Sequence, residues 1–305
     1  MAALTNNLSW SKSRAGTLGE CPRQYYYSYY GSWGGWAAGA DPRTREIYIL
    51  KQLRNRPVWA GEVVHDTVQG VLEALRDRGE APPLEDVLKA ARERMRAAFK
   101  SSRDKRYRQE PKTPALYEHE YQVKLTDAEW KATAEHVDLC LRNFYQSEVF
   151  AAIRALDLAH WLELEELTGF DVDGVRVHVK LDFSHREDGG AVLMDWKTGK
   201  SSYQNHGLQF GCYSLYATRA WGLDPGQVRG LEVNLATGKL REHRFDKSEL
   251  EAIEAEIRKS LEWMRDLLRD AKANLAFEED FPKKEGPRTC GRCNFRKVCD
   301  TSYTA

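Results

Sequence analysis

The sequence has no long apolar run and no excess of charge of either sign. No stretch of about 18 consecutive apolar residues occurs, so no membrane-spanning helix is predicted. No leader with a basic segment before an apolar one is found, and we therefore expect an intracellular, cytoplasmic protein. Lysine plus arginine and aspartate plus glutamate number 46 each, so the overall charge does not indicate a polyanionic partner.

Internal repeats, low-complexity tracts and a nucleotide-binding G-x4-GK-S/T loop are also missing, so no ATP-driven motor is predicted. The composition is globular, and 305 residues are enough for one elaborated domain or two. One stretch, residues 92–112, is locally basic, with nine lysines or arginines against three acidic residues. This basic stripe could bind a phosphate backbone or a partner protein, or it could be a solvated helix end and loop.

Hydrophobic periodicity predicts helices in the first half of the chain, followed by strands. Two strands are expected around the turn Asp173-Gly174, with the second extending to Phe183. A third strand is expected over 191–197, and a later hairpin turns at 237–239. The helices are expected at about 59–76, 84–100, 126–153, 204–221 and 247–274. This order predicts an α/β core with helical additions.

Charged residues stand at the ends of the two middle strands. Asp182 lies on the polar face of one strand, at its end. In the next strand, alternation places Asp195 and Lys197 on one face and Met194 and Trp196 on the other. If the two strands are neighbours, two carboxylates and one amine meet at one end of the sheet. The alternative is a surface ion pair between Asp195 and Lys197.

Two carboxylates and an amine suit metal-dependent chemistry on phosphodiesters. Hard divalent cations take oxygen ligands, and Mg²⁺ is typically held by one or two carboxylates, with phosphate and water completing its octahedron. A nearby lysine can orient an attacking hydroxide or stabilise the charge that develops on the phosphodiester. Hydrolysis of DNA requires such a set of groups.

The six cysteines fall into two groups. Cys140 and Cys212 lie in expected helices, where a cysteine is most simply a small buried apolar residue. Three others form a C-x2-C-x5-C pattern in a short polar tail that cannot build its own core, and a distant fourth is the obvious candidate to join them. These four are Cys21, Cys290, Cys293 and Cys299.

A metal ion or cluster is the simplest cross-link for this tail in a reducing compartment. Four cysteines can hold zinc and can equally hold an iron–sulfur cluster, so the spacing does not choose between them. Disulfides are the third alternative, disfavoured because nothing indicates secretion. A group bound by all four would close a very long loop, so its loss should loosen the whole fold.

Five motifs follow one another in an order that resembles a known family. Asp182 and the segment DWK at 195–197 resemble the PD-(D/E)xK nuclease signature. GEVVH at 61–65 is similar to the upstream G-x3-H motif of the RecB-like branch, and Gln209 and Tyr213 match its Q-x3-Y motif. The four cysteines resemble the iron–sulfur subgroup, which includes small CRISPR-associated nucleases and the AddB-type nuclease domain.

The resemblance implies a restriction-endonuclease-like core, with a mixed central sheet flanked by helices and a C-terminal iron–sulfur subdomain. It implies that Mg²⁺ or Mn²⁺ is bound by His65, Asp182 and Asp195, aided by the main-chain carbonyl of Trp196. Lys197 would position the attacking water or stabilise the transition state. The four cysteines would hold a structural 4Fe–4S cluster, with zinc less favoured.

The resemblance also gives roles to one helix and to one further acid. Gln209 and Tyr213 lie four residues apart, hence on one helical face, and would contact the DNA strand or hold the lysine. Some relatives carry a glutamate on the first strand, where Glu163, Glu165 and Glu166 compete. Glu163 and Glu165 are expected to share a face, and we take Glu165 as the additional candidate.

The implied function is that of a Mg²⁺- or Mn²⁺-dependent deoxyribonuclease, an exonuclease acting on single-stranded or frayed DNA ends. One alternative is a DNA-binding subunit without turnover. Another is an end-trimming subunit that is active only beside a helicase, an integrase or another protein of CRISPR, antiviral defence or DNA repair. The aromatic segment QYYYSYYGSWGGW could stack DNA bases, or it could pack around the cluster.

The motifs divide the chain into four expected parts. Residues 1–58 supply the first cluster cysteine, and residues 59–155 form a helical region with the G-x3-H motif and the basic stripe. Residues 156–276 form the nuclease core, and residues 277–305 form the cluster tail.

Overall fold

The computed structural model describes residues 4–199 and 206–300, and helices fill most of its first half. The α-helices are α1 (Lys12–Glu20), α2 (Pro22–Tyr26), α3 (Pro42–Lys51), α4 (Arg56–Arg78), α5 (Leu84–Arg103), α6 (Tyr117–Glu120), α7 (Asp127–Gln146), α8 (Glu148–Ala155), α9 (Gly207–Trp221), α10 (Lys247–Asp266) and α11 (Pro287–Cys290). The strands are β1 (Ser9–Trp10), β2 (Trp161–Glu163), β3 (Leu167–Val172), β4 (Val175–Lys180), β5 (Phe183–Glu187), β6 (Gly190–Lys197), β7 (Val228–Asn234) and β8 (Lys239–His243).

Two helices end earlier than their apolar periodicity predicts. The helix expected over 126–153 is in fact two, because Ser147 ends α7 and its side chain then caps α8. The long C-terminal helix, α10, ends at Asp266, and a tight turn closed by Asp270 and Leu275 follows it. In both places local hydrogen bonding stops a helix that the apolar pattern alone would continue.

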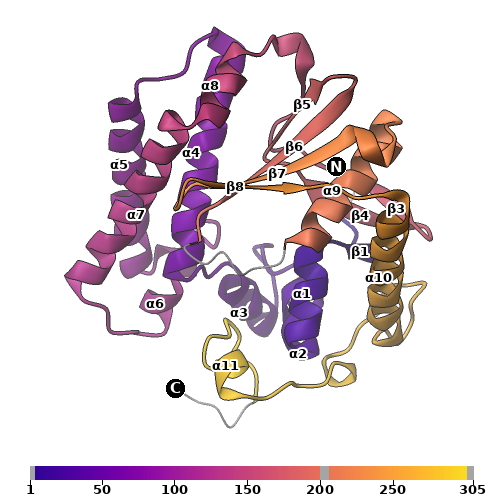
Figure 1. Ribbon diagram of the computed structural model, residues 1–305. Coiled ribbons are helices and arrows are strands. Elements are labelled where there is room, and N and C mark those ends of the chain that lie inside the picture. The colour runs from indigo at the N-terminus through magenta and orange to yellow at the C-terminus, as the bar shows by residue number, and fades with distance from the viewer. Residues whose placement is uncertain (1–3, 200–205, 301–305) are drawn as a thin grey trace.

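Two sheets combine parallel and antiparallel strands (Figure 1). The smaller has the order β1-β4-β3, and the larger has the order β2-β5-β6-β7-β8. β6 and β7 run parallel, so they need a crossover, which α9 provides. The helix expected over 204–221 is α9, and the first two of those residues lie outside the described part of the chain. Mixed sheets flanked by helices confirm the α/β class and are consistent with a restriction-endonuclease-like fold.

One long hairpin bends from the small sheet into the large one. β3 and β4 pair in the small sheet, and β2 and β5 pair in the large sheet. The prediction of one strand up to Phe183 is wrong, because β4 ends at Lys180 and Asp182 lies in the bend before β5. The apolar side chains that alternate from Val175 to Phe183 are all buried, on both sides of the bend, so the hydrophobic pattern runs through it without interruption.

Alternate residues of β6 face different cores, as the sequence predicts. Met194 and Trp196 belong to the core beneath α4, α5 and α7, whereas Leu193 belongs to the core shared with α9 and α10. Asp195 and Lys197 therefore point toward α9, and both make hydrogen bonds or ion pairs on that side. The central strand thus carries a packing face and a polar face at the same end.

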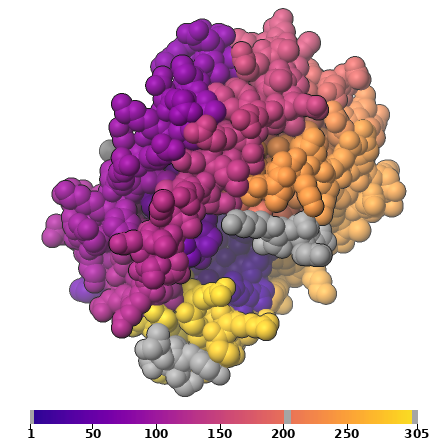
Figure 2. Space-filling model, turned by 60° about the vertical axis from the view of Figure 1, so that its left-hand side comes forward, coloured from indigo at the N-terminus to yellow at the C-terminus, as the bar shows by residue number. Residues whose placement is uncertain are grey.

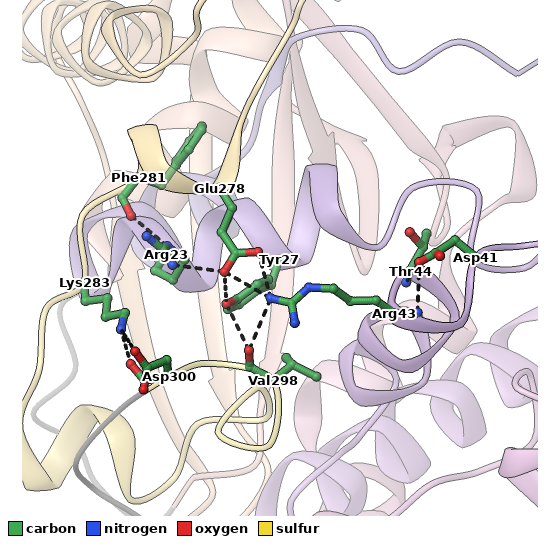
Figure 3. A network of polar contacts seen from close by, with 10 residues as sticks. All are labelled: Arg23, Tyr27, Asp41, Arg43, Thr44, Glu278, Phe281, Lys283, Val298 and Asp300. Carbon is green, nitrogen blue, oxygen red and sulfur yellow. Dashed lines mark hydrogen bonds and ion pairs between the residues drawn. The ribbon is translucent and has the colours of Figure 1, made fainter.

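A third core joins the N-terminal segment to the C-terminal tail, with Tyr27 and Phe295 among its buried residues. Beside it, Glu278 forms a polar network (Figure 3). Its Oε1 accepts from the Tyr27 hydroxyl at 2.7 Å and from Arg23 at 3.0 Å, and its Oε2 accepts from Arg43 at 2.9 Å. Side-chain contacts therefore tie the two ends of the chain together.

We expect Glu278→Ala to lower the free energy of unfolding by about 2 kcal/mol, because it leaves the largely buried Arg23 without its carboxylate and Tyr27 without its strongest acceptor. Glu278→Gln keeps an acceptor for Tyr27 and should therefore lower the free energy of unfolding by less than Glu278→Ala does. Thermal unfolding of both variants beside the wild type measures the difference. Equal stability of all three proteins would show that the Glu278 network contributes nothing measurable to holding the tail.

The basic stripe at 92–112 covers the end of α5 and the loop that follows. Four of its nine cations form ion pairs with acidic residues in the described part of the chain, so much of its charge is neutralised locally. These four are Arg92, Arg94, Arg103 and Arg108.

Candidate active site

The hairpin bend, the end of β6, α4 and α9 meet at one cavity of about 400 Å³. Pairing of Phe183 with Met194 sets β5 against β6, and this register brings Asp182 opposite Asp195. The sequence-predicted residues that line the cavity are His65, Asp182, Asp195, Trp196, Lys197, Gln209 and Tyr213. Figure 2 shows the molecule hollowed between its purple and magenta helices and its orange part, with indigo N-terminal residues at the bottom of the hollow.

Asp195 and Lys197 are held in place by α9. Lys197 Nζ lies 2.5 Å from Asp195 Oδ2 and donates to Gln209 Oε1 at 2.8 Å. Asp195 Oδ1 accepts from the Gln209 amide at 2.8 Å and from the Tyr213 hydroxyl at 2.9 Å. Burial and then Asp195 raise the pKa of Tyr213 well above its usual value, so this hydroxyl stays protonated and remains a donor. The four side chains form a closed network that fixes the ammonium group.

His65, Glu165 and Asp182 bring three donor atoms within 4.8 Å of one another. His65 Nδ1 lies 3.3 Å from Asp182 Oδ1 and 3.9 Å from Glu165 Oε1. Burial and then Asp195 raise the pKa of Asp182 to about 6. Burial would lower the pKa of His65, but the neighbouring carboxylates outweigh it and raise that pKa well above its usual value.

This donor set fits a divalent cation. Carboxylates crowded together in a buried site favour a positive charge among them. Glu165 Oε1 is buried and accepts no hydrogen bond from any described residue, which leaves it available as a ligand. Carboxylate oxygens suit Mg²⁺ and Mn²⁺, and the single imidazole departs from the all-oxygen set that Mg²⁺ prefers.

Trp196 contributes to the site through its backbone. Its amide N–H donates to Asp182 Oδ2 at 2.6 Å and so orients this carboxylate. Its indole ring points away, into the other core, where its centre lies 5.5 Å from that of Phe144. The role of its carbonyl as a metal ligand stays a prediction.

Of the three glutamates near the first strand, Glu165 lies at the site. Its Oε2 pairs with Lys180 Nζ at 2.5 Å, and its φ of 56° marks a sharp turn between β2 and β3. Glu163 instead accepts a hydrogen bond from the Tyr216 hydroxyl, and Glu166 is exposed. The expectation that Glu163 and Glu165 share a face is wrong, because the chain between β2 and β3 is not an extended strand.

The segment after β6 is held by residues that the sequence did not reveal. A ring nitrogen of His136 lies 2.8 Å from the Thr198 carbonyl, and the Asn234 amide donates to the Gly199 carbonyl at 2.9 Å. Gly61 packs here as well, since a Cβ on it would lie 3.1 Å from Thr198 Oγ1. The G-x3-H motif signals Gly61, whereas no pattern marks His136 or Asn234, which act on backbone atoms of a distant segment.

The four cysteines of the predicted cross-link line a second cavity, between the start of α2 and the C-terminal tail. Burial and then the other three thiols raise the pKa of Cys293 to about 12, and the Lys284 amide donates to Cys21 Sγ at 3.5 Å. All four cysteines thus line one cavity, and four cysteines are a ligand set that zinc or an iron–sulfur cluster takes. Cys140 and Cys212 are buried in apolar cores, as predicted.

Comparison with known proteins assigns the chain to a family. A model described as the PD-(D/E)XK nuclease superfamily matches residues 9–300. The chain belongs to the PD-(D/E)XK nuclease superfamily. The match includes both the residues around the first cavity, the candidate catalytic cavity, and the four cysteines of the second cavity. Membership in the PD-(D/E)XK superfamily indicates a metal-dependent nuclease.

This PD-(D/E)XK superfamily member is similar to a solved structure titled "Crystal structure of SSO0001", with 13% sequence identity and a TM-score of 0.30. The matched region covers 58% of this chain and 82% of the other. No curated protein matches the chain. In the part of the chain that the structure describes, no helix is long and apolar enough to cross a membrane.

Proposed function

We propose that this PD-(D/E)XK protein is a cytoplasmic, metal-dependent deoxyribonuclease of the RecB-like iron–sulfur branch, an exonuclease that acts on single-stranded or frayed DNA ends. The observation that supports this most is that Asp182, Asp195 and Lys197 meet at one cavity. The side chain of Asp195 is only 2% exposed and that of Lys197 only 19%, which disfavours a simple surface ion pair.

The acidic side of the cavity is the proposed metal site. His65, Asp182 and Asp195 would hold Mg²⁺ or Mn²⁺, with Glu165 and the Trp196 carbonyl as further ligands. A bound ion of this kind polarises a phosphoryl oxygen and lowers the pKa of a bound water. The Trp196 amide and the bend before β5 hold Asp182 in a fixed orientation for this role.

Lys197 is the proposed catalytic cation. Its ammonium group would orient the attacking water or stabilise the charge that develops on the phosphate in the transition state. Gln209 accepts a hydrogen bond from Lys197 and donates one to Asp195, so it sets the orientation of both. Tyr213 anchors Asp195 from the next turn of α9. We assign Gln209 and Tyr213 to positioning the lysine and the acid.

We also propose that the four cysteines hold a structural 4Fe–4S cluster and not zinc. Arg23, Lys284 and Arg296 line the same cavity and would offset the charge of the thiolates. Amide hydrogen bonds to Cys21 and Cys293 are of the kind that tunes a cluster. The expected parts 1–58 and 277–305 would then form one unit around the cluster, beside the helical region 59–155 and the nuclease core 156–276.

Cleavage of end-labelled DNA tests the nuclease activity. The purified protein is incubated with single-stranded and blunt duplex DNA in Mg²⁺, Mn²⁺ or EDTA. We expect strands to shorten from an end with either metal, faster for the single strand, and to stay intact in EDTA. Labels at the 5′ and 3′ ends give the polarity. Intact DNA with iron-loaded protein under all conditions would contradict the proposal and favour a binding subunit or a partner-dependent enzyme.

A further inference from the structure

Three cations of the N-terminal segment have no counter-ion among the described residues, and one of them, Lys12, lines the cavity that holds Asp182 and Asp195. Arg14 on α1 and Lys51 at the end of α3 face the same ring, that of Tyr29. The Arg14 guanidinium carbon lies 4.1 Å from the ring centre and Lys51 Nζ lies 5.5 Å from it. Lys12, also on α1, is exposed. None of the three forms an ion pair with any residue that the structure describes.

The fold leaves this positive charge uncompensated. Burial and then Arg14 and Arg54 hold the pKa of Lys51 below its usual value. Burial and then Arg14 also lower the pKa of His178. Like charges gathered in this way repel one another and reduce the stability of the fold. A bound polyanion would relieve the repulsion, as the phosphates of a nucleic acid do.

The three cations begin at the rim of the catalytic cavity. Lys12 lines that cavity together with Lys197, and it also lines a neighbouring cavity of about 600 Å³ together with Arg14. Gln209 and Tyr213 line both cavities. An anion bound beside Lys12 would therefore lie next to the proposed reacting centre, where a neighbouring phosphate of a substrate strand belongs.

Beyond Lys51 lies a pair of exposed aromatic rings. Trp33 and Trp36 are 39% and 38% exposed and pack edge to face with ring centres 5.0 Å apart. Trp36 also contacts Tyr48, three residues before Lys51 on α3, at 5.9 Å. Arg14 and Lys51 thus meet at the ring of Tyr29, and the same helix α3 that carries Lys51 also contacts the tryptophan pair through Tyr48 (Figure 1 shows α1 and α3).

The loop that carries the tryptophans is seated firmly on α3. Gly35 stands between them, and a Cβ there would lie 2.4 Å from the Cβ of Tyr48, so only glycine allows this approach. Arg45 donates a hydrogen bond to the Gly35 carbonyl at 3.0 Å. The backbone between the two rings is therefore anchored on α3, while the rings themselves stay partly exposed, as bases that stack on them would require.

We propose that a single DNA strand entering the catalytic cavity is bound along this path, with its phosphates on Lys12, Arg14 and Lys51 and its bases stacked on Trp33 and Trp36. The occupant follows from the chemistry, because unpaired cations complement a polyanion and exposed rings stack only on bases that are not already stacked in a duplex. This path rests on the proposed function for its direction toward the reacting centre, but its binding chemistry does not depend on cleavage.

Binding of a fluorescent 20-nucleotide thymidine strand in EDTA tests the path, because no cleavage is then possible. We expect Trp33→Ala and Trp36→Ala each to weaken binding about tenfold. Lys12→Ala and Lys51→Met should each lower the slope of log affinity against log salt by about 0.7, the value for one lost single-strand phosphate contact. A merely structural role would leave that slope unchanged.

Matched controls lie on α10, away from the path. Trp263→Ala removes a tryptophan that is 42% exposed, and Lys259→Ala removes an exposed lysine; both should bind like the wild type. An abasic strand adds a test of the rings that needs no variant: because it takes the bases away from both tryptophans, wild-type protein should bind it more weakly than the normal strand by more than the tenfold expected for loss of one ring.

Equal binding of normal and abasic strands by the wild type would overturn the aromatic platform, and unchanged salt slopes in both lysine variants would overturn the phosphate contacts. Tighter binding of a blunt duplex than of the single strand would overturn the choice of occupant. If the single strand binds as expected but is not cleaved in Mn²⁺, the result would contradict the proposed nuclease activity and leave the binding path standing.

Discussion

Replacing Lys197 with alanine is expected to slow metal-dependent DNA cleavage by about 10²–10³-fold. The ammonium group is held 2.5 Å from Asp195 and 2.8 Å from Gln209, so its position is set before any substrate arrives. A preorganised cation of this kind stabilises developing charge without reorganising during the reaction. Single-turnover cleavage of an end-labelled strand at saturating Mn²⁺ measures the loss, with Lys259→Ala as the matched lysine control.

Metal binding separates the role of Lys197 from that of the acids. Because Lys197 is itself a cation, its removal should leave the Mn²⁺ affinity measured by calorimetry unchanged or increased. Asp182→Asn should lose both metal affinity and cleavage. Lys197→Met, which keeps the apolar stem beside the buried Asp195, provides a second variant if the alanine variant does not fold. Cleavage at the wild-type rate by either folded Lys197 variant would contradict the catalytic role assigned to Lys197.

The parts of the site that could be predicted are those set by local rules. Residues two positions apart in a strand lie on the same face, so the sequence places Asp195 and Lys197 together. The structure confirms that they share a face. Residues four positions apart in a helix lie on the same side, so Gln209 and Tyr213 are expected on one face of their helix. Both side chains contact Asp195 in the structure. The two side-chain periods, 2.0 residues in a strand and about 3.6 in a helix, are enough to make these statements.

The parts that could not be predicted depend on where the chain bends. Asp182 and Glu165 meet because one hairpin passes from one sheet into another, yet buried apolar residues continue through that bend. His136 and Asn234 were missed because their partners are backbone carbonyls of a distant segment, which carry no sequence signal. Periodicity reports burial, and burial does not change where a strand leaves one sheet for the next.

The cysteine cavity should control the stability of the protein without setting the rate of its chemistry. Cys21→Ser replaces one proposed cluster ligand by a residue of similar size that cannot act as a thiolate. We expect an anaerobic preparation to lose its brown colour and most of its iron and sulfide. Closing a loop as long as the one between Cys21 and Cys290 is worth about 5 kcal/mol, so Tm should fall by about 10 °C.

The fall in stability should be partial, because the Glu278 network and the third core still hold the tail to the N-terminal segment. The cysteine cavity and the catalytic cavity share no residue, so well below Tm the cleavage rate of Cys21→Ser should stay within about threefold of the wild type. Cys212→Ala, which removes a buried thiol outside the cavity, should keep its iron. A colourless wild type with one zinc per chain would refute the cluster while keeping the cross-link, because four thiolates around zinc close the same loop.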